Sequence, residues 1–158
     1  IAISFAETAE FFQKEKVALT GNPIRREVIG GNFYEAEDLF KLEFQSKENS
    51  ESKFSPPVLL IIGGSQGAQK INNVVLDAIL DMVKEYQIIH QCGKKNFDEI
   101  KKISEMILKD DKNKSRYHLY SSLNENELRN ASFAADLVVS APARRQFLKL
   151  PRGASPVF

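Results

Sequence analysis

The sequence predicts an α/β fold in which helices cover both faces of a parallel sheet. Three observations support this prediction. Strand-forming runs alternate with segments that have apolar residues at helical spacing throughout residues 58–140. The runs Val58–Ile62 and Leu137–Ser140 are apolar without alternation, as is typical of strands buried on both faces. The glycine-rich turn Gly63–Ala68 follows the first of these runs and opens a helix.

Apolar spacing and turn-forming residues predict the individual elements. Asn22-Pro23 separates a short first group from the rest, because a residue before proline disfavours helix. A helix packed on a sheet needs an apolar stripe, and the helix after the glycine turn has one at Ile71, Val74, Val75, Ala78, Ile79 and Met82. We expect strands at Ile1–Ser4, Val17–Thr20, Val58–Ile62, Gln87–Gln91, Tyr117–Tyr120 and Leu137–Ser140, and helices at Glu7–Lys14, Tyr34–Phe44, Ala68–Lys84, Asn96–Lys109 and Asn124–Ala134.

Composition narrows the class of protein. A hydrophobic content of 42% with 27% charged residues is ordinary for a soluble globular chain. The single cysteine, Cys92, excludes an intrachain disulfide and a cysteine metal cluster. The net charge of +1 is uneven, because residues 141–158 carry four basic side chains and no acid. Such a tail can bind nucleic acid or anionic lipid, but we expect no nucleic-acid partner, for a reason given below. Because the chain begins with Ile1 rather than methionine, we expect an excised or incomplete piece.

The turn Gly63–Ala68 is the strongest candidate for a ligand site. Glycines allow a sharp turn and a close approach of a ligand to the backbone, Ser65 adds a hydroxyl, and the following helix adds partial positive charge. This combination favours an anion, usually phosphate. The turn is neither a Walker A loop nor a G-x-G-x-x-G motif, so a glycine turn without a ligand stays open as an alternative.

Two other groups of residues have weaker cases. Arg25 could bind a phosphate through its guanidinium, but on the residues alone a surface arginine equivalent to Arg26 is the better interpretation. His90 and Cys92 end a predicted strand, where open sheets place ligands, and we favour a buried strand end with its polar groups satisfied. His118 is given no role. Neither a metal site nor a Ser/His/Asp triad is evident, so we expect no metal and no cofactor.

Taken together, four segments resemble the bacterial MurG family in order and spacing. They are Thr20–Arg25 (TGNPIR), Gly63–Ala68 (GGSQGA) with Asn72, His90–Lys94 (HQCGK), and Ala135–Ser140 (ADLVVS). The combination of the first two motifs is specific, and the resemblance covers Ile1 to Ser140. This family transfers N-acetylglucosamine from its UDP donor to lipid I, the undecaprenyl-pyrophosphoryl-muramoyl-pentapeptide, and so makes lipid II.

The resemblance implies a GT-B arrangement of two Rossmann-like domains, of which this chain holds parts. It implies that residues 1–44 end the N-terminal, acceptor-side domain, residues 45–57 form a linker, and residues 58–140 are the first half of the C-terminal UDP-sugar-binding domain. The polar composition of 45–57 and its Pro56-Pro57 end independently favour a linker there.

The resemblance also implies which residues bind the donor UDP-N-acetylglucosamine. Arg25 matches the family arginine that contacts the UDP-sugar, Ser65 matches the serine of the donor loop, and Leu123 is the best match for an aliphatic residue that makes a backbone contact. Gly63, Gly64, Gln66 and Gly67 support the donor loop. The segment 121–127 is longer than the family's, and no catalytic base is identifiable.

The resemblance stops after Ser140, where the family continues with a glycine-rich turn and a helix that bears Ser-Glu. A one-base shift of the reading frame from the third base of Pro142, with permitted codons, translates as GATTISEIAAWGKPSI, which matches the missing family segment. We therefore expect residues 141–158 to be an out-of-frame tail and the chain itself to be inactive. A tail that is in frame and divergent is the alternative.

By resemblance the intact protein is a hexosyltransferase of peptidoglycan and cell-wall synthesis, with roles in cell shape and cell division. It would act peripherally on the cytoplasmic face of the bacterial plasma membrane, where its lipid substrate lies. Two other classes stay open. One is a different GT-B enzyme that uses another nucleotide-sugar, and the other is a non-catalytic nucleotide-binding module.

Overall fold

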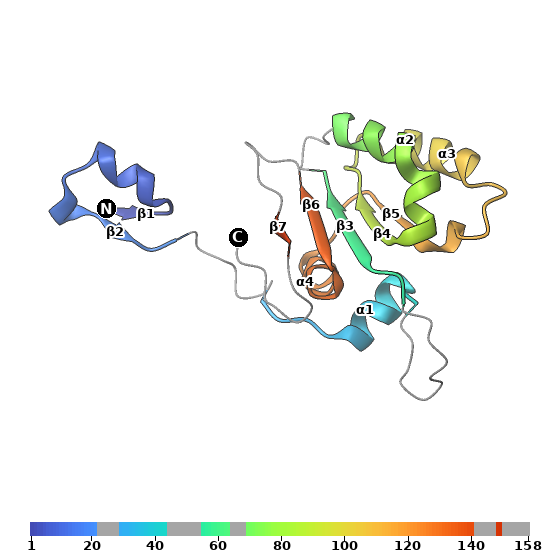
Figure 1. Cartoon of the computed structure of the whole chain (residues 1–158), viewed down its shortest axis with the longest axis horizontal. Helices are drawn as coiled ribbons and strands as arrows, with labels where there is room; N and C mark the ends of the chain where they lie inside the picture. Colours follow the sequence, from blue (N-terminus) through green and yellow to red (C-terminus); the bar gives the residue numbers. More distant parts are fainter. Residues whose placement is uncertain (22–28, 44–54, 64–68, 141–147, 150–158) are drawn as a thin grey trace.

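The computed structural model describes residues 1–21, 29–43, 55–63, 69–140 and 148–149 (Figure 1). In chain order its elements are β1 (Ala2–Ile3), η1 (Ala6–Phe11), η2 (Lys14–Lys16), β2 (Ala18–Leu19), α1 (Phe33–Phe40), β3 (Val58–Ile62), α2 (Gln69–Glu85), β4 (Gln87–Gln91), α3 (Phe97–Ile107), η4 (Lys114–Arg116), β5 (Tyr117–Tyr120), α4 (Glu125–Ala134), β6 (Leu137–Ser140) and β7 (Leu148–Lys149).

The first segment forms a two-stranded parallel sheet, in which Ala2 pairs with Ala18 and Ile3 with Leu19. The α-helix expected at Glu7–Lys14 is replaced by the two short 3-10 helices η1 and η2. Neither of them contains a buried residue. Because most helical stability in proteins comes from packing an apolar face, a segment with no buried face has little to stabilise a regular α-helix.

The second sheet has the strand order β5-β4-β3-β6-β7. Its first four strands are parallel, which confirms the α/β class predicted from the unbroken apolar runs. The register pairs Leu60 with Ile89 on one side and with Val138 on the other. The strand β7 is antiparallel to β6. Only residues 141–147 lie between β6 and β7, whereas a parallel crossover requires about a dozen residues or more.

Helices lie on both faces of this sheet, with α2 and α3 on one face and α1 and α4 on the other (Figure 1). Alternate residues of the central strand β3 point to the two faces. Leu59 and Ile61 belong to a core with Val75, Ile79 and Val83 of α2. Val58 and Leu60 belong to the opposite core with residues of α1 and α4. The face of α2 that packs is rotated from the expected stripe, because Val74 is 66% exposed and Asn72 is buried.

The helix α1 packs on the larger sheet. Ala36, Phe40 and Leu42 are buried in one core with Val58 and Leu60 of β3. Phe33 also packs edge-on against Phe133 of α4, with ring centroids 4.9 Å apart. The helix α1 therefore completes the α4 face of the larger sheet, although it precedes the expected linker in the sequence.

Candidate functional site

The strand order identifies where this sheet would bind a ligand. The chain runs outward from β3 to β4 and β5 and then returns through α4 to place β6 on the other side of β3. Open α/β sheets bind ligands in the crevice outside the carboxyl ends of the strands at such a reversal. By this rule the expected ligand crevice lies beyond Ile62 and Ser140, which are paired in the register. The topology thus selects the end of β3 that is followed by the glycine-rich turn.

Gly63 is the described residue of that turn, and it is buried. Its N–H donates to the carbonyl oxygen of Gln91 at 2.9 Å, so it continues the sheet ladder and is not free for an anion. Gly64, Ser65, Gln66 and Gly67 lie outside the described residues. The helix α2 begins at Gln69 and runs for 17 residues, which gives its N-terminus roughly half a positive charge beside the crevice.

The other two expected donor contacts have different outcomes. Arg25 lies outside the described residues. Leu123 follows β5 at the same carboxyl edge as Gly63, and it packs against the core under α1 and α4. Asn124, directly after it, caps α4 through a capping box: its Oδ1 accepts from the Glu127 N–H at 2.9 Å, and a Glu127 carboxylate oxygen accepts from its N–H at 2.7 Å. The backbone next to Leu123 is thereby held by the start of a helix.

A buried hydrogen-bond network joins β4 and β5 to the first turn of α2. The hydroxyl of Tyr117 lies 2.8 Å from Nδ1 of His90, and Nε2 of His90 lies 3.1 Å from Oδ1 of Asn72. Nδ2 of Asn72 donates to the carbonyl oxygen of Cys92 at 3.0 Å. His90, Asn72 and Cys92 are each fully buried. The expectation of a buried strand end with satisfied polar groups is therefore confirmed for His90.

Sequence reasoning did not find the role of Asn72 in this network. A pattern was present, because Asn72, Val75, Ile79 and Val83 follow one another at helical spacing on the buried face of α2. A polar residue on such a stripe needs a buried partner. What the spacing could not supply was the identity of that partner, which comes from a different strand.

Burial shifts the pKa values of His90 and Cys92 away from the values that acid–base or nucleophilic catalysis would need. It lowers the pKa of His90 to about 4, so the imidazole is neutral at pH 7. It raises the pKa of the Cys92 thiol to about 11, so the sulfur is not a thiolate at that pH. These two residues are structural parts of the edge of the sheet.

The Asp136 of the Ala-Asp motif also has a structural place. Its carboxylate accepts from the Val58 N–H at 2.9 Å, and its own N–H donates to the Val58 carbonyl at 2.8 Å. Both bonds join the amino ends of β6 and β3. Asp136 therefore lies at the end of the sheet opposite the crevice and supports the pairing that creates it.

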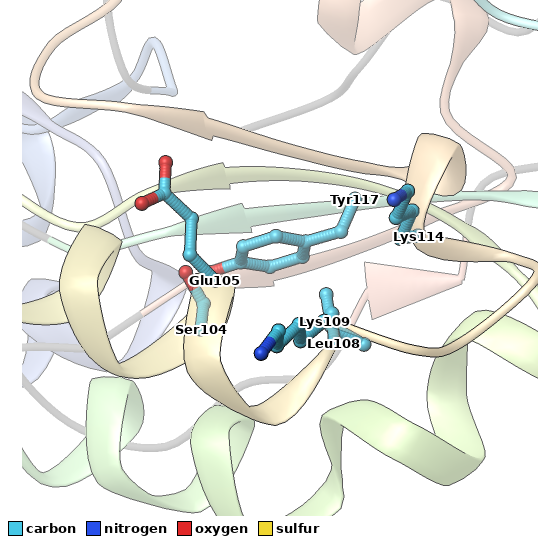
Figure 2. Close-up of a pocket in the computed structure, with 6 residues that line it drawn as sticks. All are labelled: Ser104, Glu105, Leu108, Lys109, Lys114 and Tyr117. Atoms are coloured by element: carbon cyan, nitrogen blue, oxygen red, sulfur yellow. The ribbon is translucent and has the colours of Figure 1, made fainter.

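A cavity of about 340 Å³ lies between the second half of α3 and the start of β5 (Figure 2). It is lined by Ser104, Glu105, Leu108, Lys109, Lys114 and Tyr117. Tyr117 is the first residue of β5, so the cavity opens toward the amino end of that strand. It is separate from the crevice beyond β3 and β6, and we assign it no part in binding the donor.

The described ranges hold no group of three or more His, Cys, Asp or Glu side chains placed to bind a metal ion. None of the helices in the described part of the chain is long and apolar enough to cross a membrane.

The chain is similar to named bacterial transferases. Over 99 residues it is 44% identical to "UDP-N-acetylglucosamine--N-acetylmuramyl-(pentapeptide) pyrophosphoryl-undecaprenol N-acetylglucosamine transferase 2" of Bacillus cereus (strain ATCC 10987 / NRS 248). The aligned residues are 63% of this chain and 25% of that protein. Over 140 residues it is 35% identical to the transferase of the same name, without the number, of Clostridium botulinum (strain Hall / ATCC 3502 / NCTC 13319 / Type A). The aligned residues are 89% of this chain and 34% of that relative.

The chain thus spans between a quarter and about a third of the length of these relatives. Residues 58–140 match the family described as the glycosyltransferase family 28 C-terminal domain. They contain β3, β4, β5 and β6 together with the three helices that connect them. Because this match extends over more than half of the 158 residues, the chain belongs to glycosyltransferase family 28, within its C-terminal domain.

Proposed function

We propose that this chain is part of a MurG-type enzyme that transfers N-acetylglucosamine from UDP-N-acetylglucosamine to lipid I. The observation that supports the proposal is the reversal of strand order at β3 and β6, because open α/β sheets bind ligands beyond the carboxyl ends of their strands at such a reversal. The substrate class comes from the relatives, whose names give an N-acetylglucosamine transferase acting on an undecaprenol pyrophosphate acceptor.

In this proposal the backbone amides from Gly64 to Gly67 and the Ser65 hydroxyl bind the diphosphate of the donor. Arg25 pairs with the UDP-sugar, and the backbone at Leu123 contacts the nucleotide. The Gly63 amide is excluded from this set because it is bonded to Gln91. No described residue is assigned as the catalytic base, and no metal or cofactor is part of the scheme.

The chemistry proposed for the intact enzyme is an inverting transfer. A hydroxyl of the acceptor sugar attacks the anomeric carbon, a base takes the hydroxyl proton, and UDP leaves with the electrons of the broken glycosidic bond. Negative charge grows on the diphosphate as that bond breaks. In the proposal, amides of the turn and the positive end of α2 stabilise this charge, as preorganised hydrogen-bond donors and dipoles do.

The decisive experiment uses the full-length protein with an in-frame continuation after Ser140. Labelled N-acetylglucosamine from UDP-N-acetylglucosamine should appear in a lipid I analogue, and a panel of other UDP-sugars should react at least about tenfold more slowly. Transfer from another UDP-sugar would instead favour a different GT-B enzyme. Tight UDP binding with no transfer from any donor would favour a non-catalytic nucleotide-binding module.

Three variants test the assigned residues. Arg25→Gln and Ser65→Ala should each raise the donor KM by about tenfold, the loss expected for a charge-assisted hydrogen bond. Arg26→Gln is the matched control for the arginine, because it removes the same charge from the next position. Equal effects of the changes at 25 and 26 would contradict the role of Arg25.

The proposed tail needs a separate test, and most of residues 141–158 lies outside the described residues. Sequencing the DNA from upstream of Ile1 to beyond the codon of Phe158 should reveal a one-base slip near Ser140. An unshifted frame that codes the same tail in several independent isolates would end this hypothesis. The transferase proposal would survive that result, because it rests on residues before the junction.

The cellular setting is proposed from the acceptor. An undecaprenol-linked substrate places the intact enzyme peripherally on the cytoplasmic face of the bacterial plasma membrane. Its product would feed peptidoglycan and cell-wall synthesis, with consequences for cell shape and division. Fractionation of cells that express a tagged full-length protein should therefore recover it with membranes, and salt or alkaline washing should release it.

A further inference from the structure

The two helices on one face of the sheet are tied to a single backbone carbonyl at the end of β4. Nδ2 of Asn72, in the first turn of α2, donates to the carbonyl oxygen of Cys92 at 3.0 Å. Nδ2 of Asn96, which directly precedes α3, donates to the same oxygen at 3.3 Å. Side chains at both helix N-termini are therefore hydrogen-bonded to one carbonyl oxygen at the carboxyl edge of the sheet.

The orientation of the Asn72 amide is determined by its partners. Because Nδ2 donates to a carbonyl, Oδ1 faces His90, and an oxygen acceptor there requires a donor on Nε2. Nε2 of His90 therefore carries the proton in the neutral ring, and Nδ1 is the acceptor. The hydroxyl of Tyr117 supplies the matching donor at 2.8 Å. The donors and acceptors of Tyr117, His90 and Asn72 therefore match along the three hydrogen bonds, with each donor facing an acceptor.

The network also extends from the carboxyl edge of the sheet to the cavity between α3 and β5. Figure 2 shows the ring of Tyr117 crossing that cavity, with Ser104 of α3 beside its hydroxyl end. Burial and, to a smaller extent, the neighbouring Cys92 raise the pKa of Tyr117, so its hydroxyl is protonated and can donate. Hydrogen bonds thus connect Tyr117, beside the cavity, through His90 to the first turn of α2.

We infer that Asn72 is a positioning residue for the donor: held by His90 and Tyr117, it fixes the first turn of α2 against β4 and so aims the helix N-terminus at the diphosphate. This inference rests on the proposed function. The reason is geometric, because a helix N-terminus acts on an anion only within about its first turn. A small rotation of that turn moves several amides away from the ligand together.

The main experiment compares Asn72→Asp with Asn73→Asp in the full-length, in-frame protein. Both changes replace a side-chain amide by a carboxyl group in the same turn of α2. Asn73 is exposed, and the hydrogen bond described for its side chain runs along the helix, from Nε2 of Gln69, whereas Asn72→Asp also removes the donor to the Cys92 carbonyl. We expect UDP affinity, measured by calorimetry, to fall about tenfold or more for Asn72→Asp relative to Asn73→Asp.

A purely structural role for Asn72 predicts a different result. It would lower the melting temperature but leave UDP affinity and the donor KM, both measured well below that temperature, equal to those of Asn73→Asp. Equal donor affinities for the two variants would therefore overturn the inference. A wild-type protein that binds no UDP-sugar would instead show that the proposed function is wrong, and the two failures are distinguishable because they concern different proteins.

Conservative replacement of His90 gives a second readout. His90→Gln can keep a donor toward Asn72 and an acceptor toward Tyr117, whereas His90→Leu keeps neither. We expect the glutamine variant to recover most of the UDP affinity that the leucine variant loses. Equal losses would contradict the network.

The protonation pattern can be examined without any ligand. In ¹⁵N-histidine spectra of the 158-residue chain, His90 should show a protonated Nε2 and an unprotonated Nδ1 at pH 7. The assignment is simple because His118 is the other histidine in the sequence, and His118→Gln removes its signals. A protonated Nδ1, or a doubly protonated ring at that pH, would overturn the proposed orientation of Asn72.

Discussion

At the scale of single residues, burial determines the charge state of His90, which the sequence motif around it does not indicate. Both ring nitrogens contact neutral partners, Tyr117 and Asn72, and the ring is fully buried. Burial without a compensating negative partner disfavours the charged ring, which is why the pKa falls to about 4. The histidine is therefore neutral over the whole range in which the protein would work.

This lowered pKa predicts an acid-dependent loss of stability. The contribution of neutral His90 to stability is fully present above about pH 6.5, the pKa of the unfolded state, and is lost as the pH falls toward about 4. The reason is that in this range the unfolded chain binds a proton at His90 and the folded chain does not. The free energy of unfolding should decrease by about 3 kcal/mol at most across this window. Urea unfolding of the wild type and of His90→Gln at several pH values would measure it.

The comparison between the two proteins isolates His90, because carboxylates and His118 titrate in both. We expect the difference in unfolding free energy between wild type and His90→Gln to shrink as the pH is lowered. A difference that stays constant between pH 7 and pH 4 would contradict the assignment of a buried neutral ring.

Gly31 illustrates a close approach that only glycine allows. A Cβ at this position would overlap the Cβ of Phe133, and it would lie 2.8 Å from Cγ of Phe133 and 3.1 Å from the carbonyl oxygen of Arg129. These atoms belong to α4, so the segment before α1 docks directly on that helix. The N–H of Asn32 reinforces the docking by donating to Oδ1 of Asn130 at 3.0 Å.

Gly31→Ala should therefore destabilise the fold by about 3 kcal/mol, the upper range for overpacking against backbone. Gly30→Ala is the matched control, because Gly30 has a φ of +78° but open space around its missing Cβ. Its cost should be about 1 kcal/mol, from backbone strain alone. Chemical denaturation of both variants would compare them, and a larger loss for Gly30→Ala would count against the docking.

At the scale of elements, α1 behaves as part of the larger sheet. Phe40 is 1% exposed and packs edge-on against Tyr120 of β5, with ring centroids 5.5 Å apart. Asn32 caps the start of the helix by accepting from the Tyr34 N–H at 2.9 Å. A cap at one end and an aromatic anchor at the other hold the helix on the α4 side.

Removal of the anchor should show this dependence. Phe40→Ala should lower the free energy of unfolding by about 3–5 kcal/mol, as expected for a fully buried phenylalanine. Tyr34→Ala, near the start of the same helix, should cost less than about 0.5 kcal/mol because Tyr34 is 81% exposed. If Phe40→Ala were nearly neutral, α1 would not belong to the core of the larger sheet.

At the scale of the whole molecule, the family's C-terminal domain has the GT-B fold, and this chain holds four of its parallel strands together with a short antiparallel partner, β7. Large apolar side chains remain exposed in the first segment, among them Phe5 at 57% and Phe11 at 81%. An uncovered apolar surface of this kind favours self-association.

We expect the 158-residue chain to show no transferase turnover by itself. The reason is that the proposed site would lack the parts that the family places after Ser140 and in its acceptor domain. Assay of the isolated chain and of the in-frame full-length protein under the same conditions would test this, with sedimentation analysis to detect self-association. Measurable turnover by the isolated chain would contradict the expectation.

The division between what was predictable and what was not follows from the range of the forces involved. Apolar runs and helical spacing are local, so Val58–Ile62, Gln87–Gln91, Tyr117–Tyr120 and Leu137–Ser140 were predicted with the bounds that the structure has. The family resemblance was likewise carried by short motifs. The type of the helix near residues 6–16 was not predictable in this way, because it depends on whether a face is buried.

The sequence by itself determined that the chain alternates strands and helices and that a glycine-rich turn follows the first strand of the larger sheet. The tertiary structure alone decided that β6 returns to the side of β3, that α1 closes the α4 face, and that Asn72, His90 and Tyr117 meet. These contacts join residues far apart in the chain. They follow from which surfaces bury the most apolar area together, and no local spacing encodes that choice.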